Sequence, residues 1–147
     1  MNGNAHLIGG ALSGPFTGAV LAKRSNRQPT LPEIGGWLLG GIAGAKTPDL
    51  LEPAYCPRHR EVCHSVSVLA LDAALLQSRT LENWIQSFHR KAADYRRRSQ
   101  SEPDNAFLLS LLALLFELLA GLLPGFLGGY ASHLILDSTT PCGLPVL

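Results

Sequence analysis

The sequence predicts an all-α protein: a compact helical bundle of apolar, glycine-rich helices, forming a single domain over residues 1–147. Long apolar runs with helical spacing make up most of the chain, and neither a strand-like alternation nor an internal repeat stands out. Hydrophobic residues make up 46% of the chain and charged residues only 16%, below the usual quarter. Together with a mean hydropathy of +0.16, this composition indicates a membrane-associated or unusually apolar small protein.

The first third of the chain predicts two helices followed by a long loop. Residues 5–22 are apolar and rich in small residues, with Asn4 as a candidate N-cap and Pro15 as a candidate kink. Glycines weaken a helix in water but suit close helix packing in membranes. Residues 34–45 predict a short second helix, again rich in glycine. Residues 46–64 contain three prolines and almost no periodicity, so they predict a loop.

Four further helices are predicted over residues 65–77, 81–98, 106–123 and 126–140. Ser65 opens the first of them, and the second is amphipathic and basic. The third is the most apolar run of the chain and carries a single charge, Glu117. Pro124 is predicted to turn the chain between the third and the fourth.

The charge pattern favours association with a membrane. About 20 apolar residues are needed to cross a bilayer, and only the 106–123 run and the first helix approach that length. Basic residues follow the first helix at 23–27 and precede the long apolar run at 90–98. A trace of alternate crossings puts both basic segments on one side, as the positive-inside rule requires, and places His6 and the 46–64 loop on the other. A soluble bundle whose apolar helices bury one another is the alternative.

The net charge, the basic stretch and the cysteines exclude few classes of function. A net charge of +1 gives no general reason to expect a nucleic-acid partner. The basic stretch from His89 to Arg98 contains Tyr95, but a solvated helix face or a cytoplasmic anchor is the commoner origin of such a run. His89 is interpreted as a solvated bystander. Three cysteines, with no CxxC pair, leave the redox compartment undecided.

His133 and Asp137 have the clearest local geometry among the reactive residues. Their i,i+4 spacing places both side chains on one helical face, about one turn apart. The three residues between them are apolar, so the pair is predicted to face an interior or a cavity, where polar groups need partners. Such a pair can bind one metal ion together, or one residue can orient the other. A His–Asp pair on a helix surface is the alternative.

The 46–64 loop holds most of the other reactive side chains. His59 and His64 are five residues apart, so one continuous helix would not present them together, but a loop could bring them together. Asp49 lies in the same loop, and His6 begins the first helix. A closed structural zinc site is an alternative for the segment, although its spacing fits no standard zinc finger. The residues of that site would be Cys56, His59, Cys63 and His64.

Four motifs in order resemble a known family, the inner-membrane-associated, metal-dependent hydrolases exemplified by the LexA-regulated YdjM-like proteins. The family is itself distantly similar to zinc-dependent phospholipase C and P1-type nucleases. The motifs are "AHLIGGA", "TPDLLEP", "HREVCHS" and "GYASHLILDSTTPCGLPVL". They contain all the reactive residues discussed above except His89 and Cys56, and they touch both ends of the chain.

The resemblance implies a helical metal-dependent hydrolase of a phosphoester at the inner membrane, with a phospholipid as one candidate substrate. Its implied metal ligands are His6, Asp49, His59, His64, His133 and Asp137. One or more divalent ions, most plausibly Zn²⁺, would provide hydroxide from bound water at neutral pH. Arg60 and Glu61 are the candidate catalytic residues, with Arg60 neutralising a phosphate. A non-catalytic, membrane-associated interaction protein with a structural metal or a His/Asp polar cluster is the alternative.

The chain also departs from the family pattern. Leu51 stands in place of the second aspartate of the "LPDID" motif, and Glu61 in place of a glycine. Glu52 or Glu61 is a candidate replacement for the missing carboxylate.

Overall fold

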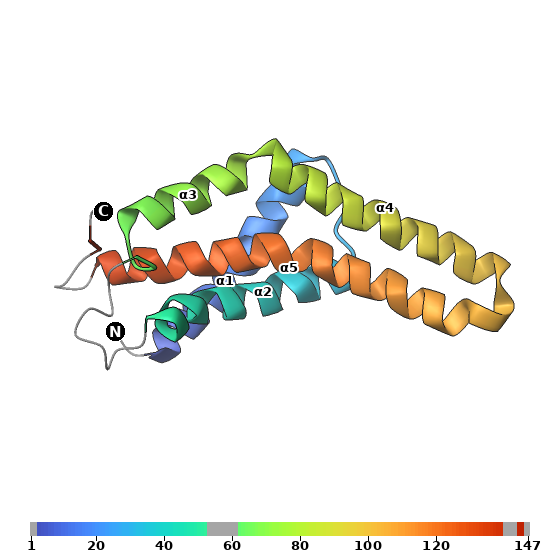
Figure 1. Ribbon diagram of the computed structural model, residues 1–147, viewed down its shortest axis with the longest axis horizontal. Coiled ribbons are helices and arrows are strands. Elements are labelled where there is room, and N and C mark those ends of the chain that lie inside the picture. The colour runs from blue at the N-terminus through green and yellow to red at the C-terminus, as the bar shows by residue number, and fades with distance from the viewer. Residues whose placement is uncertain (1–2, 53–61, 140–143, 146–147) are drawn as a thin grey trace.

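The computed structural model describes residues 3–52, 62–139 and 144–145, and every regular element in these ranges is helical. The all-α prediction is therefore confirmed. The elements are α1 (Gly3–Arg24), α2 (Leu31–Leu51), α3 (Val66–Gln77), α4 (Arg79–Ser101), the 3₁₀ turn η1 (Pro103–Asn105) and α5 (Ala106–Ser138) (Figure 1).

The long helix α5 is the centre of the bundle and contacts each of the other four α-helices. In Figure 1, α3 and α4 follow one another along one side of α5, while α2 lies on the other side. α1 packs on both α2 and α5. The start of α1, the end of α5 and the start of α3 lie at the same end of the bundle. Residues distant in sequence are thereby brought together at that end.

The three helices α1, α2 and α5 pack closely because glycines line their contacts. A β-carbon added to Gly10 or to Gly129 would collide with the carbonyl oxygen of Gly41. One added to Gly41 would in turn collide with the carbonyl oxygen of Gly10. Gly41 therefore lies where the backbones of all three helices meet, an arrangement common in membrane bundles.

The helix α2 is longer than the sequence predicted, and this corrects the reading of residues 46–51 as loop. Thr30 caps its start by accepting a hydrogen bond from the Glu33 amide at 3.4 Å. At its other end the helix continues through Pro48, which is fully buried. A proline removes one backbone hydrogen bond from a helix. α2 continues despite that loss, with Pro48 buried in the bundle. Asp49 consequently lies on the last turn of a helix.

The predicted turn at Pro124 is also wrong, because α5 runs without interruption from Ala106 to Ser138. Pro124 is fully buried, and the nearby positions on the helix hold the small buried residues Ala120, Gly121 and Gly125. Membrane helices tolerate proline where neighbouring segments pack against the altered backbone. α1 likewise continues through Pro15.

In the part of the chain that the structure describes, two helical stretches are long and apolar enough to cross a membrane, Asn4–Arg24 and Pro103–Ser138. The outer face of α1 carries a row of large exposed apolar side chains, Ile8, Leu12, Phe16 and Val20, one turn apart. The inner face of the same helix carries glycines. Large apolar residues outside and small ones inside are the pattern expected of a helix that faces lipid.

A polar triad at residues 27, 33 and 89 ties the α1–α2 connection to α4 and corrects the reading of His89 as a solvated bystander. Arg27 donates two hydrogen bonds to the Glu33 carboxylate, at 3.0 and 3.2 Å, and lies 2.8 Å from Nε2 of His89. Burial alone would raise the pKa of Glu33, but its hydrogen bonds with His89 and Arg27 bring that pKa below its ordinary value. His89 therefore takes part in packing α4 on the bundle.

Candidate metal centre

Imidazole and carboxylate side chains from three helices and one loop converge at one end of the bundle. They are His6 of α1, Asp49 of α2, His64 from the segment before α3, and His133 and Asp137 of α5. Four of the five are buried, and His64 and His133 have no exposed surface at all. Only Asp49, whose side chain is 55% exposed, opens the cluster to its surroundings. Buried polar groups in such number need mutual partners or an ion.

The helices bring these residues together because each polar side chain continues a row of small residues. On α5, His133 and Asp137 follow Gly129 at intervals of one turn, and on α2 Asp49 follows Ala45 in the same way. On α1, His6 precedes Gly10 by one turn. Residues four apart lie on one face of a helix, so the faces that make the glycine contacts also carry the reactive groups.

Donor atoms of Asp49, His64 and His133 are spaced as a small tetrahedral ion requires, and Asp137 lies close to both histidines. Nε2 of His64 and Nε2 of His133 are 3.3 Å apart, and Oδ1 of Asp49 lies 3.5 and 3.6 Å from them. Oδ2 of Asp137 lies 3.7 Å from His64 Nε2 and 3.5 Å from His133 Nε2. Zn²⁺ binds nitrogen and oxygen at about 2.0–2.2 Å in tetrahedral sites, which separates its donors by about 3.3–3.6 Å. The donors of Asp49, His64 and His133 therefore fit such an ion in both chemistry and spacing.

His133 is oriented toward this cluster by the backbone of α2. Its Nδ1 lies 2.6 Å from the carbonyl oxygen of Ala45. Since a carbonyl only accepts, Nδ1 donates, and Nε2 is left with a lone pair directed at His64, Asp49 and Asp137. Histidines that bind metals commonly use such a second hydrogen bond to fix their tautomer.

Glu52 performs the same task for His64. One carboxylate oxygen of Glu52 lies 2.9 Å from His64 Nδ1, and the other accepts hydrogen bonds from the amides of Val62 and Cys63 at 2.8 and 3.0 Å. Burial alone would raise the pKa of Glu52, but the bonds from His64 and from the two amides lower it overall. Glu52 thus faces Nδ1 of His64 and acts as its positioning residue. It is not placed here as a replacement ligand.

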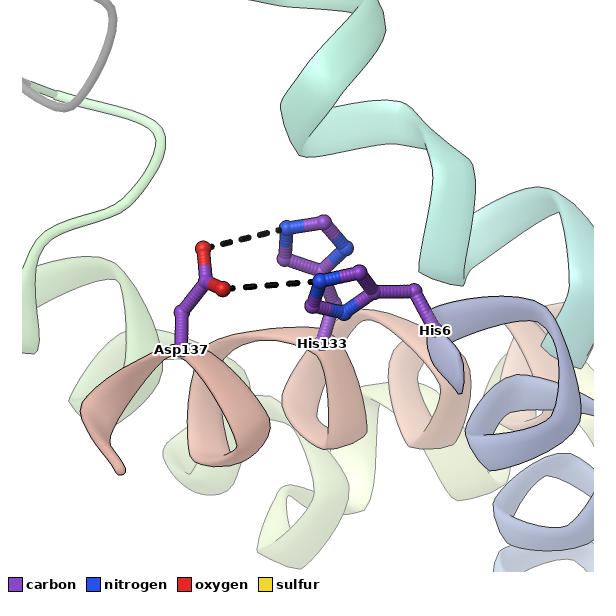
Figure 2. A group of neighbouring side chains, drawn as sticks. All are labelled: His6, His133 and Asp137. Atoms are coloured by element: carbon purple, nitrogen blue, oxygen red, sulfur yellow. Dashed lines mark ion pairs between the residues drawn. The ribbon is translucent and has the colours of Figure 1, made fainter. Parts of the chain in front are cut away.

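His6 extends the cluster on the other side of His133. Its ring stacks on that of His133 with centroids 3.9 Å apart, and its Nε2 lies 3.5 Å from Oδ1 of Asp137. The two oxygens of Asp137 therefore face different histidines, as Figure 2 shows. Among the described residues, Nδ1 of His6 is buried without a hydrogen-bond partner. His6, His133 and Asp137 can hold an ion as a group, and so can Asp49, His64 and His133.

A cavity of about 320 Å³ opens beside the cluster, and its lining includes one cationic side chain. It is lined by His6, Ala45, Lys46, Asp49 and Leu50. The exposed Lys46 is one turn before Asp49 on α2, and within the described part of the chain it forms no ion pair. A cationic group and an apolar side chain, Leu50, thus border the opening of the candidate metal centre.

The described residues cover five of the six predicted ligands. His59 and the predicted catalytic residues Arg60 and Glu61 lie outside them, as does Cys56 of the alternative zinc site, so their roles stay predictions. Lys46 was not singled out by the sequence, and Glu52 was noted only as a replacement ligand. A signal in the sequence that could have pointed to them is their position, three residues before and three residues after Asp49.

The fold and this cluster define a helical membrane protein with a buried His/Asp group that could hold a divalent metal ion. The family model of the YdjM inner membrane protein matches residues 1–147, and the chain belongs to that family. This match confirms the predicted location at the inner membrane. No curated protein and no solved structure is similar enough to count as a match.

Proposed function

We propose that this member of the family is a metal-dependent hydrolase that acts on a phosphoester at the inner membrane. The observation that carries the proposal is the convergence of three donors, from Asp49, His64 and His133, at 3.3–3.6 Å. Structural zinc sites use cysteine or a closed set of four protein ligands. Here Asp49 is half exposed and faces a cavity, as expected of a site that admits a substrate.

Each residue of the cluster has a definite task in this proposal. Asp49, His64 and His133 would hold the ion, with zinc the best fit to the donors, and its fourth position would be left to water. His6 and Asp137 would help to hold a further ion. Glu52 and the Ala45 carbonyl hold the two histidines in their productive tautomers. A zinc ion bound there would lower the pKa of a coordinated water to about 7.

The surroundings of the cluster favour an anionic substrate. Lys46 offers an ammonium group at the cavity beside His6 and Asp49, suited to the negative charge of a phosphoester. Leu50, also at the cavity, is largely exposed, and the protein belongs to a membrane family. A phospholipid is therefore one candidate within the phosphoester class, and Arg60 remains a second predicted contact to the phosphate.

Metal analysis of the purified protein tests this proposal. Wild-type protein in detergent should retain zinc and hydrolyse bis(p-nitrophenyl) phosphate, whereas His64→Ala and His133→Ala should lose both properties. His89→Ala is the matched control, because His89 contacts Arg27 and Glu33 outside the cluster. Wild-type protein without transition metal, or full activity in both cluster variants, would refute the proposal.

A non-catalytic role has one specific observation in its favour: His133 also ties α5 to α2 through the Ala45 carbonyl. In that case the cluster would serve to stabilise an interaction protein. The His133→Ala variant would then unfold, whereas a catalytic role predicts a folded, inactive protein. Circular dichroism of the variant distinguishes the two outcomes.

A further inference from the structure

A second buried carboxylate lies away from the metal centre, in the middle of α3. Asp72 is only 4% exposed, and its Oδ2 atom has no hydrogen-bond partner among the residues that the structure describes. Neither does Asp72 form an ion pair within that part of the chain. Burying a carboxylate without a partner is unfavourable, and an ionisable residue buried in a membrane protein marks a functional site by default.

Asp72 borders a cavity between α3 and α5 whose other walls are almost wholly apolar. The cavity has a volume of about 220 Å³ and is lined by Val68, Leu71 and Leu75 of α3 and by Phe126, Leu127 and Tyr130 of α5. We call this cavity, with Asp72, the α3–α5 cleft. None of its residues lines the cavity at the metal centre.

The one other polar group in the cleft does not satisfy Asp72. The Tyr130 hydroxyl donates its hydrogen bond to the carbonyl oxygen of Cys63 at 2.8 Å, so its proton is already used. Burial raises the pKa of Asp72 to about 7. No cation among the described residues counteracts that rise. Since no described residue supplies a donor to Oδ2 of Asp72, that atom is open to a ligand that enters the cleft.

We propose that the α3–α5 cleft binds a membrane amphiphile that carries a primary ammonium group, with the ammonium on Asp72 and the alkyl chain on the apolar walls. An ammonium supplies both the hydrogen-bond donor and the positive charge that the carboxylate lacks. The walls accept an alkyl chain, and a protein of the inner membrane meets such amphiphiles at high local concentration. A hydroxyl group would supply a donor but leave the charge uncompensated.

Calorimetric titration of the full-length protein in non-ionic detergent tests this proposal with octylammonium and octan-1-ol as probes. Wild-type protein should bind one octylammonium per chain at least tenfold more tightly than octan-1-ol. Asp72→Asn, which keeps the shape and removes the charge, should reduce octylammonium binding to the level of octan-1-ol. Asp94→Asn is the matched control, because Asp94 is an exposed carboxylate on α4 that pairs with Arg97.

The pH dependence adds a second measurement. As the pH falls from 8 to 6, Asp72 takes up a proton and octylammonium binding should weaken in wild-type protein and stay flat in Asp72→Asn. Tyr130 is the other titratable group that lines the cleft, and it stays protonated over this range. Leu75→Trp fills the cleft while the carboxylate is retained and should also lose binding, even where Asp72→Asn fails to fold.

Three results would overturn the proposal. Unchanged binding in Asp72→Asn would exclude the carboxylate, and equal binding of the two probes would indicate partition into detergent. Equal loss in Asp94→Asn would indicate general charge attraction. Because zinc retention is measured separately, these outcomes leave the proposed hydrolase function untouched.

Discussion

The substitution Gly41→Ala tests whether the glycine contact between α1, α2 and α5 holds the metal centre in place. A β-carbon on Gly41 would collide with the carbonyl oxygen of Gly10 and lie 3.0 Å from Cα of Gly14. These are backbone atoms of α1, so no side-chain rotation relieves the contact. A carbon and a carbonyl oxygen pack at about 3.3–3.6 Å, and α1 therefore has to move away from α2 by about 1 Å.

Two opposing effects set the magnitude of the loss. Overpacking of a tight contact costs about 1–3 kcal/mol, and a collision between two backbones belongs at the upper end. Replacing glycine by alanine inside a helix returns about 1 kcal/mol. We expect the free energy of unfolding to fall by about 1–2 kcal/mol in total. Because His6 lies one turn from Gly10, its displacement should also lower zinc affinity by about tenfold or more.

Gly35→Ala is the matched control on the same helix. A β-carbon there would meet only Cδ1 of Leu118, at an ordinary 3.8 Å. This variant should be as stable as wild type or more stable by up to about 1 kcal/mol, with unchanged zinc affinity. Unfolding by a denaturing detergent measures the stability of both variants, and competition with a chelator measures the zinc affinity. If Gly41→Ala matches Gly35→Ala in both assays, the reasoning about the glycine contact is refuted.

Three further predictions concern single side chains. Glu52→Gln should lower zinc affinity by about 10- to 100-fold in a folded protein, measured by chelator competition, because it weakens the bond that orients His64. Asp72, whose pKa is raised from 3.8 to about 7, keeps its proton to a higher pH in the folded state than in the unfolded state. The free energy of unfolding should therefore fall by about 4 kcal/mol as the pH rises from the lower to the higher of these pKa values. Unfolding of Asp72→Asn, measured over the same pH range, should lack that fall. Lys46→Ala should raise KM for bis(p-nitrophenyl) phosphate at unchanged zinc content, whereas Lys23→Ala should not.

Local patterns in the sequence predicted the helices and their reactive faces, and the prolines were where this reasoning went wrong. Ser65 caps α3 as expected, by accepting a hydrogen bond from the Val68 amide at 3.3 Å. His133 and Asp137 share a face as their spacing required. Pro48 and Pro124 were read as helix ends because proline breaks isolated helices. Both are fully buried, and the packing that compensates for them comes from helices far away in sequence.

The same distance in sequence explains what was missed in the side chains. His89 was read as solvated because its charged partner Arg27 lies 62 residues away. Glu52 was considered only as a replacement ligand, since the bond to Nδ1 of His64 depends on how the chain returns to α3. The order of the four motifs predicted which residues to consider for a common site. It could not distinguish a residue that faces the cluster centre from one that orients a ligand.

The cluster and the packing of the bundle have one origin in the sequence. On α1, α2 and α5, one or two turns separate the small residues that let the backbones approach from His6, Asp49 and His133 on the same faces. Side chains that reach only a few bonds from the backbone can meet at 3.3–3.7 Å only if the helix axes are already close. The glycine rows therefore set the spacing of the donors as well as the stability of the fold. A substitution that widens the contact should affect both properties, however far it lies from the donors.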